Sequence, residues 1–415
     1  MSLLADLLAS VLDRPDRGAE GAEFRGRGLE DLAADLLSER GEISGMAMAR
    51  EILRRFGSLD AEGKAAFFRH ITTEMDLSGT DLRAALAAYE DAPTKATYRA
   101  LMSAAEPQRQ EFIRRLNQAP GATAALVGMR DDLLQQMRAA PELAPLDLDF
   151  RHLFASWFNR GFLVLLPVNW DTSARVLEKI IAYEAVHTID SWEDLRRRLE
   201  PADRRCFAFF HPAMPGEPLI FVEVALTRGI PGSIADLLAE DREELDPARA
   251  DTAVFYSISN CQAGLAGISF GNSLIKQVVA DLSTDHPGLS TFVTLSPIPG
   301  FCRWAEGAEI DLSGLAEERM VETAAQYLLE AKRPDGRPLD PVARFHLGNG
   351  AVIHALHAAA DPSERGQRQS AGVMVNYLYD LGRISQNHEA YAQDGTIAAA
   401  SAVRSLARRA QKTDA

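Results

Sequence analysis

Apolar residues recur at helical spacing through the first 158 residues of the chain. One series is Leu3, Leu4, Leu7, Leu8, Val11 and Leu12, and another is Leu29, Leu32 and Leu36. Residues three and four apart share one face of a helix, so this part is predicted to be a series of amphipathic helices. Clusters of Gly, Pro, Asp and Ser predict breaks at residues 14–27, Ser78–Asp81 and Ala119–Ala122. We expect an all-helical domain over 1–158 that acts as a scaffold or an oligomer contact, because no polar constellation stands out in it.

The pattern changes near residue 160 to short runs rich in β-branched and aromatic residues. The predicted strands are Phe162–Val168, Cys206–Phe210, Leu219–Leu226, Ala253–Ile258 and Thr291–Leu295. Helical patterns separate several of them, at Ser173–Tyr183, Trp192–Leu199 and Asn272–Leu282. Strands that alternate with helices predict a largely α/β or α+β second domain, which we expect over residues 159–415. The expected fold class is α+β multidomain, with an all-α helical bundle ahead of it.

Length, composition and charge narrow the class of protein. A chain of 415 residues is too long for one ordinary core, which favours two domains. With 47% apolar and 25% charged residues and no long uncharged apolar run, we expect a soluble protein without a membrane partner. The net charge of -15 disfavours nucleic acid as a partner. An anionic small molecule stays possible, because a helix N-terminus or a few local cations can bind phosphate.

Cysteine usage and the two termini bear on location. Cys206, Cys261 and Cys302 lie far apart without a CxxC pairing, which is neither a disulfide framework nor a zinc site. The N-terminal stretch lacks the basic region and apolar core of a presequence, and the last residues, QKTDA, are no peroxisomal signal. We therefore expect a cytoplasmic protein.

Residues 255–279 form the most informative stretch, which is predicted to be a strand, a glycine-rich turn and a helix. Such a turn places backbone N–H groups and the positive end of a helix dipole where a pyrophosphate can bind, and Gly264, Gly267 and Gly271 permit close backbone approach. No GK[ST] follows and the spacing is not GxGxxG, so the motif is neither a Walker A loop nor a dinucleotide fingerprint. A plain strand-to-helix connection stays an alternative.

A second interpretation of the same stretch is a serine hydrolase. Gly267, Ser269 and Gly271 match GxSxG, and His346 lies downstream as a candidate base. A nucleophile elbow needs its strand to end directly before the first glycine, whereas here the strand is predicted to end near Ser259, about seven residues earlier. This places Ser269 in the first turn of the helix and disfavours the hydrolase.

Several uncommon motifs occur together in the second half of the chain. They are HPAMPGEPL (211–219), the glycine-rich stretch (255–279), TLSPIPGF (294–301), RFHLGNGAV (344–352) and GVMVNYLY (372–379). In this order, from about Glu184 to Tyr379, the chain resembles the malonyl-CoA decarboxylase family. The resemblance implies a catalytic domain related to the GNAT acyltransferases, in which the turn between a central strand and the next helix holds the coenzyme A (CoA) pyrophosphate.

The resemblance also implies site residues. The catalytic serine of the SPIPGF motif falls on Ser296, the catalytic histidine of the FHLxNGA motif on His346, and a tyrosine of the NYxY motif on Tyr379. The CoA-binding positions are Ala266, Gly267, Ile268, Ser269, Phe270, Gly271 and Asn272. Some relatives have an acidic residue where this chain has Ser269. By itself a serine before proline is commonly a turn residue, and a tyrosine on an apolar strand is commonly core, so the motif match carries these assignments.

The implied reaction converts malonyl-CoA to acetyl-CoA and carbon dioxide through an enolate, in fatty acid or malonate metabolism. The thioester is itself the electron sink, so we expect no metal, biotin or pyridoxal phosphate. The end of strand 291–295 should bring Ser296 to the acyl end of the substrate, where it donates a hydrogen bond or acts as a base. His346 should protonate the enolate carbon, because the unperturbed pKa of histidine lies near working pH.

Two other functions stay open at this level. One is an N-acyltransferase with an amine acceptor, and the other is a non-catalytic acyl-CoA sensor. The resemblance further implies a homo-oligomer that assembles through the helical domain.

Overall fold

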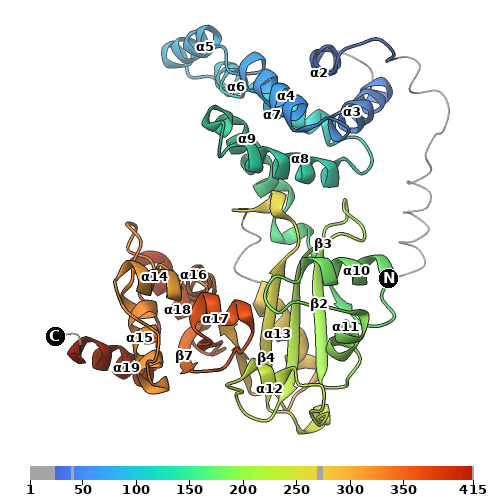
Figure 1. Cartoon of the computed structure of the whole chain (residues 1–415). Coiled ribbons are helices and arrows are strands. Elements are labelled where there is room, and N and C mark those ends of the chain that lie inside the picture. Colours follow the sequence, from blue (N-terminus) through green and yellow to red (C-terminus); the bar gives the residue numbers. More distant parts are fainter. Residues whose placement is uncertain (1–23, 39–41, 269–273, 414–415) are drawn as a thin grey trace. The chain divides into compact units, whose positions relative to one another are not determined.

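The computed structural model describes residues 24–38, 42–268 and 274–413 (Figure 1). The chain divides into two compact units. The first consists of Met1–Leu163 with two later segments, His211–Glu217 and Gln262–Phe270. The second holds Val164–Phe210, Pro218–Cys261 and Gly271–Ala415. The domain boundary expected at residue 158 stays a prediction. The two later segments belong to the helical unit because of their contacts with it, and such contacts cannot be inferred from the order of residues.

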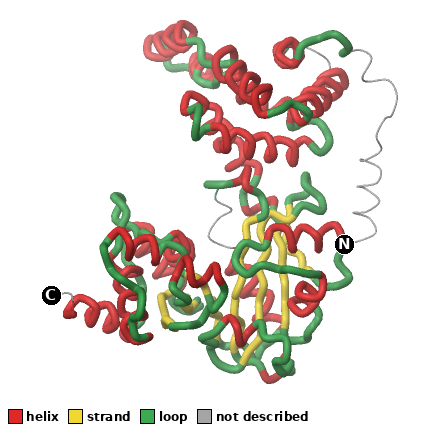
Figure 2. The backbone as a smooth tube through the Cα atoms, in the orientation of Figure 1, coloured by secondary structure: helices red, strands yellow, loops and turns green. Residues whose placement is uncertain are grey.

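The first unit is helical in its described residues up to 163, as predicted (Figure 2). Its α-helices are α2 (Leu29–Leu37), α3 (Glu42–Gly57), α4 (Ala61–Glu74), α5 (Gly79–Asp91), α6 (Lys95–Ala104), α7 (Gln108–Leu116), α8 (Ala122–Gln136) and α9 (Ala144–Trp157). Phenylalanines from three of them meet in the core, where Phe56 packs against Phe67 and Phe68, and Phe67 against Phe112. The hairpin of α5 and α6 differs, since neither of these two helices has a buried residue.

Helix caps account for the breaks. α7 ends at Leu116 and α8 begins at Ala122, as the Ala119–Ala122 cluster predicted. The turn predicted at Ser78–Asp81 is partly wrong, because α5 already begins at Gly79. The Ser78 hydroxyl accepts a hydrogen bond from the Asp81 N–H, and an acidic side chain in the first turn is favourable near the positive end of the helix dipole. The residues predicted to form a turn therefore form the start of helix α5. The predicted break at 14–27 lies largely outside the described residues.

The second unit is built on one sheet of eight strands. Its strands are β1 (Val164–Val168), β2 (Arg204–Phe210), β3 (Pro218–Thr227), β4 (Thr252–Asn260), β5 (Thr291–Thr294), β6 (Ser296–Pro297), β7 (Val352–His357) and β8 (Met374–Leu378). Their order is β1-β2-β3-β4-β5-β8-β6, with β7 also paired to β8. The β4–β5 pair is parallel and the other described pairs are antiparallel.

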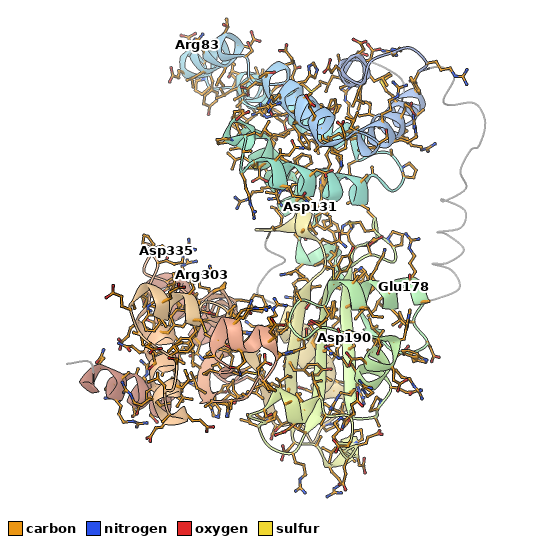
Figure 3. All side chains as sticks on the ribbon, in the orientation of Figure 1. Arg83, Asp131, Glu178, Asp190, Arg303 and Asp335 are labelled. Carbon is orange, nitrogen blue, oxygen red and sulfur yellow. The ribbon has the colours of Figure 1, made fainter. Side chains whose placement is uncertain are left out.

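The described part of the second unit also contains ten α-helices. They are α10 (Ala174–Tyr183), α11 (Trp192–Leu199), α12 (Ile234–Leu237), α13 (Leu274–Asp285), α14 (Phe301–Gly307), α15 (Glu317–Glu330), α16 (Pro341–Gly348), α17 (Glu364–Ser370), α18 (Ile384–Asp394) and α19 (Ser401–Thr413). α10 and α11 contribute Leu177, Ile180 and Leu195 to a core shared with β1, β2 and β3. Exposed charged residues such as Glu178 on α10 and Asp335 lie at the surface (Figure 3).

The α+β class is confirmed, with a helical N-terminal part and a mixed-sheet C-terminal part. The five strands expected from the sequence correspond to β1–β5. β2 and β3 are joined by a short loop, which imposes antiparallel pairing. β4 is the central strand and α13 follows it, in the strand–turn–helix arrangement that the resemblance implies.

None of the helices in the described residues is long and apolar enough to cross a membrane. The cytoplasmic location stays a prediction.

Candidate active site

Ser296 lies at a bend between two strands. β5 ends at Thr294, and Ser296 begins the two-residue strand β6, where it pairs with Val375 of β8. The serine is 6% exposed. Its hydroxyl donates a hydrogen bond of 2.8 Å to the Thr294 Oγ1, and its Oγ lies 3.3 Å from the Nε2 of His346. Two residues 50 positions apart in the chain therefore meet.

His346 occupies the last turn of the short helix α16. Its ring is buried and stacks on Tyr377 with 4.5 Å between ring centroids and 22° between planes. Its Nδ1 lies 2.8 Å from the hydroxyl of Tyr379, which is also buried. Tyr379 follows β8 directly, and its N–H donates to the Phe292 carbonyl. The structure thus brings together Ser296, His346 and Tyr379, the three predicted catalytic residues.

Asp340 ties the serine and histidine segments to each other. One carboxylate oxygen caps α16 by accepting from the N–H groups of Val342 and Ala343. The other accepts from the Gly300 N–H at 3.3 Å, in the turn that follows Ser296, and from the Tyr327 hydroxyl at 3.4 Å. An aspartate before a proline is a recognisable helix start, so the sequence could have revealed the cap, whereas the bond to Gly300 depends on the fold.

Burial decides the protonation of the histidine. Desolvation lowers the pKa of His346 to about 3, so the imidazole is neutral at pH 7. This corrects the expectation of a pKa near working pH. Desolvation also raises the pKa of the Tyr379 hydroxyl well above its ordinary value, so the phenol keeps its proton.

The hydrogen bonds fix where the protons lie. A hydroxyl has one proton, and the proton of Ser296 goes to Thr294. The Ser296 Oγ therefore accepts from the Nε2–H of His346, which leaves Nδ1 as the acceptor of the Tyr379 hydroxyl. The site is a neutral chain of donors that runs from tyrosine through histidine to serine. The roles of Thr294 and Tyr377 were not predicted, because no local pattern marks them.

Part of the predicted CoA loop is described. Ala266, Gly267 and Ile268 follow a short 3-10 turn at Ala263–Leu265, whereas Ser269, Phe270, Gly271 and Asn272 lie outside the described residues. Gly267 has a φ of +74°, a conformation that side chains other than that of glycine rarely adopt. A Cβ at Gly264 would lie 1.9 Å from the Val127 carbonyl oxygen, so glycine is required there too.

Buried charges in the helical unit were missed in the sequence, where no polar constellation stood out. Arg130 of α8 is 1% exposed, and its Nε donates to Asp147 at 2.8 Å. Arg109 of α7 is paired with Asp149 in the same way. Arginine and aspartate spaced along separate amphipathic helices look like ordinary surface residues until the helices pack.

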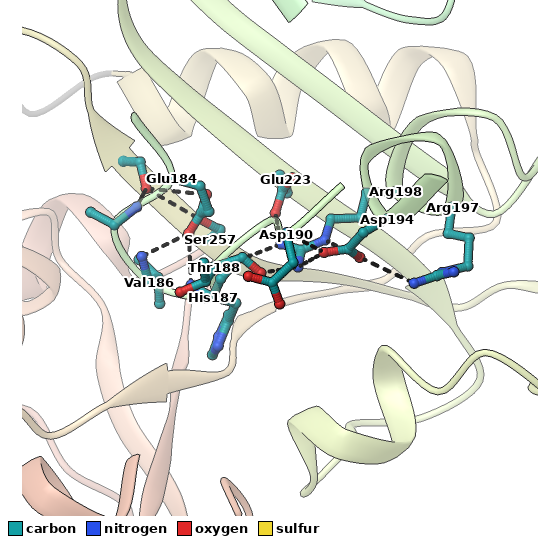
Figure 4. Close-up of polar contacts among 12 residues, drawn as sticks. Glu184, Val186, His187, Thr188, Asp190, Asp194, Arg197, Arg198, Glu223 and Ser257 are labelled. Carbon is teal, nitrogen blue, oxygen red and sulfur yellow. Dashed lines mark hydrogen bonds and ion pairs between the residues drawn. The ribbon is translucent and has the colours of Figure 1, made fainter. Parts of the chain in front are cut away.

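A buried polar network lies elsewhere in the second unit (Figure 4). Glu184 accepts from the N–H groups of Val186 and His187 and from the Ser257 hydroxyl. Arg198 contacts both Asp194, at 3.1 Å, and Glu223, at 3.3 Å. Complete burial, together with the nearby Glu184 charge, raises the pKa of Glu223 to about 8. Glu223 is therefore protonated at neutral pH.

This network predicts a pH-dependent stability. The folded protein keeps the Glu223 proton up to about pH 8, whereas the unfolded chain loses it near 4.5, so stability falls as pH rises through this window. In Glu223→Gln this contribution is absent. The free energy of unfolding of the variant should rise relative to the parent by on the order of 1 kcal/mol per pH unit from pH 5 to 8, measured by urea unfolding. As a control, the exposed Glu178→Gln variant should keep the pH dependence of the parent. The prediction would be contradicted if the free energies of unfolding of Glu223→Gln and the parent differed by the same amount at every pH from 5 to 8.

Within the described ranges, no group of three or more His, Cys, Asp or Glu side chains is arranged to hold a metal ion. Cys206 and Cys302 take part in no disulfide bond among the described residues.

Both units match families of known proteins. Residues 77–158 match the family model for the malonyl-CoA decarboxylase N-terminal domain, and residues 161–316 and 308–415 match the model for the C-terminal domain. Among animal proteins, the mitochondrial malonyl-CoA decarboxylase of Anser anser anser is 35% identical over 335 residues, which cover 69% of this chain and 66% of that protein. The protein of the same name from Rattus norvegicus is 34% identical, over 72% of this chain and 71% of that protein.

Solved structures agree with these matches. The crystal structure of malonyl-CoA decarboxylase from Rhodopseudomonas palustris is 50% identical, with a TM-score of 0.85, over 91% of this chain and 98% of that one. The one from Agrobacterium vitis is also 50% identical, with a TM-score of 0.86, over 91% and 99%. These matches show that the chain is an enzyme of the carboxy-lyase class. The chain belongs to the malonyl-CoA decarboxylase family.

Proposed function

We propose that this enzyme converts malonyl-CoA to acetyl-CoA and carbon dioxide through an enolate, without a cofactor. The observation that carries the proposal is the buried chain of Tyr379, His346 and Ser296, which lies on the family's motif positions. The C–C bond to the carboxylate breaks, its electron pair moves into the thioester as an enolate, and the carbon then takes up one proton. The substrate supplies the electron sink, so the protein has to orient the carboxylate, stabilise the enolate oxygen and deliver the proton.

Each residue has a role that fits its protonation. The Ser296 hydroxyl, released from Thr294, donates to the malonyl carboxylate or the thioester oxygen, which makes it a positioning donor and not a base. The neutral His346 gives its Nε2 proton to the carbon. Imidazole is a weak acid, but the carbon of a thioester enolate is a stronger base than imidazolate. Tyr379 replaces the proton at Nδ1, over the 2.8 Å hydrogen bond that already joins them, so the imidazole stays neutral and the negative charge of the enolate passes to the Tyr379 oxygen. A proton from water then restores the phenol, which is the proton that the overall reaction consumes.

For the coenzyme, we propose that the loop Ala266–Asn272 holds the CoA pyrophosphate. The positive φ of Gly267 and the exposed position of this residue support the proposal. β4 leads into the loop and β5 leads toward Ser296, and the two strands are parallel neighbours. Their pairing ends at Phe255 and Thr294, although β4 continues to Asn260. The carboxyl ends of these strands are therefore the proposed location of the acyl thioester.

The role of Tyr379 leads to a prediction. Tyr379→Phe removes the hydroxyl that donates to the histidine and should lower kcat roughly tenfold to a hundredfold with little change in KM, because general acid catalysis contributes about that much or more. Steady-state kinetics with malonyl-CoA would measure this. Tyr391→Phe is the matched control, since the buried Tyr391 hydroxyl has no hydrogen-bond partner among the residues that the structure describes. Unchanged kcat in Tyr379→Phe would remove the tyrosine from the proton path.

One assay separates this function from the alternatives. Purified protein is incubated with malonyl-CoA alone, in the presence of a chelator, and acetyl-CoA and carbon dioxide are quantified. Equal amounts of both products are the expected result. A requirement for an amine acceptor would indicate an N-acyltransferase, and release of free CoA with malonate would indicate a hydrolase. Binding of malonyl-CoA without any product would indicate a sensor.

We further propose that the chain forms a homo-oligomer through its helical unit. The hairpin of α5 and α6 has no buried residue, and it exposes Leu86, Tyr98 and Met102. Exposed apolar side chains clustered on one element are typical of a protein interface. Light scattering should therefore give a mass above that of one chain.

A further inference from the structure

Arg130 reaches the CoA loop from the helical part of the chain. Its Nη1 donates hydrogen bonds to the Gly264 carbonyl at 2.7 Å and to the Ala266 carbonyl at 3.0 Å, across more than 130 positions of sequence. All of these residues belong to the first compact unit. Asp147 balances the charge of the guanidinium, and the side chain is buried. The arginine therefore binds groups inside the protein and does not itself contact a ligand.

The bond to Ala266 has a consequence for the next residue. In a trans peptide the C=O and the following N–H point in opposite directions. A guanidinium that holds the Ala266 carbonyl therefore directs the Gly267 N–H away from α8. Ala266 and Gly267 are exposed, and within the described ranges the Gly267 N–H donates to no acceptor. An exposed backbone N–H without a partner is the donor type that binds phosphate oxygens.

Two further features suit an anion at this position. The positive φ of Gly267 turns the backbone sharply there. A Cβ built on Gly267 would lie 3.9 Å from the Nη2 of Arg151, an exposed residue of α9. A phosphate near the Gly267 N–H would thus also lie near a cation. Gly264 lies close to the Val127 carbonyl and so keeps the turn against α8. The arginine can therefore reach the carbonyls of both Gly264 and Ala266.

We propose that Arg130 is a positioning residue for coenzyme A. It orients the Ala266–Gly267 peptide so that the Gly267 N–H binds the pyrophosphate. The inference rests on the proposed assignment of this loop to CoA. Arg130 lies outside the loop and outside the five motifs that carry the family resemblance.

The test measures CoA binding separately from catalysis. Arg130→Lys keeps a charge beside Asp147, but an ammonium group cannot replace the planar fork that bridges the carboxylate and both carbonyls. We expect the Kd of CoA, from calorimetry, and the KM of malonyl-CoA each to rise roughly tenfold, as for loss of a hydrogen bond to a charged group, with kcat within about twofold of the parent. The double variant Arg130→Met/Asp147→Met removes both charges, so no carboxylate is left buried alone, and it should show the same rise.

Arg109→Lys is the matched control. Arg109 is 5% exposed and ion-paired with Asp149 and Asp76 in the same unit, but it has no bond to the described part of the loop. The Kd of CoA for the Arg109→Lys variant should stay within about twofold of the Kd for the parent. A parent-like Kd in both folded Arg130 variants would overturn the proposal, and so would an equal rise in the Arg109 control. A parent that binds CoA but produces no acetyl-CoA would contradict the proposed reaction and leave the Kd comparison valid.

Discussion

Replacing His346 with alanine should lower kcat for malonyl-CoA about a thousandfold, within the range of a hundredfold to ten-thousandfold that general acid–base catalysis contributes. The His346 ring contacts both the Ser296 Oγ and the Tyr379 hydroxyl, so its removal interrupts the proton path at its centre. The Kd of CoA should change little, because the residue belongs to the acyl end of the proposed site. Single-turnover formation of acetyl-CoA and calorimetry with CoA would measure the two effects separately. Turnover close to that of the parent would exclude the histidine from the mechanism.

The pH profile tests the protonation state of this residue. Because burial lowers the pKa of His346 to about 3, the free enzyme carries neutral imidazole from pH 5 to pH 8. If this neutral form is the active one, kcat/KM should show no dependence on the titration of His346 across that range. A mechanism that requires imidazolium would instead make kcat/KM fall tenfold with each pH unit above 3. Such a fall, absent from His346→Ala, would show that a charged histidine donates the proton.

Ser296→Ala should lower kcat by a factor of about a hundred to a thousand, which is the usual cost of one lost donor to a developing negative charge. The change leaves the fold nearly intact, because Thr294 still accepts from the Tyr377 N–H. KM should change less than kcat if the serine donates mainly to the enolate oxygen. If it donates mainly to the malonyl carboxylate, KM should rise as well, so the split between the two constants identifies the acceptor.

Ser370→Ala provides the matched control for the serine. Ser370 is as deeply buried as Ser296, but its hydroxyl donates to the Gly366 carbonyl, away from the histidine. Its kcat should remain within about twofold of the parent. Parent-like turnover in Ser296→Ala would mean that the serine is a turn residue before proline and nothing more.

Local patterns were enough to predict much of the fold. Helical spacing predicted the helices of the first unit, and β-rich runs predicted β1 to β5. The strands β7 and β8 were not predicted, although the motif GVMVNYLY contains all of β8. β6 has two residues, too few to produce any period. Whether neighbouring strands pair parallel or antiparallel could not be predicted either. A hydrophobic pattern shows which face of a strand is buried, but it does not show the direction of the strand relative to its neighbours.

The sequence by itself determined the residue types of the site and the family, because Ser296, His346 and Tyr379 each lie in an uncommon motif. It also determined two local features: the Asp340 cap ahead of Pro341, and the glycine at position 267 with its left-handed backbone. The tertiary structure alone decided that the imidazole of His346 is neutral, since desolvation depends on everything that packs around the ring. It also decided that Arg130 contacts a loop more than 130 residues away, because a long-range hydrogen bond depends on how separate elements pack and leaves no periodic signal in the chain.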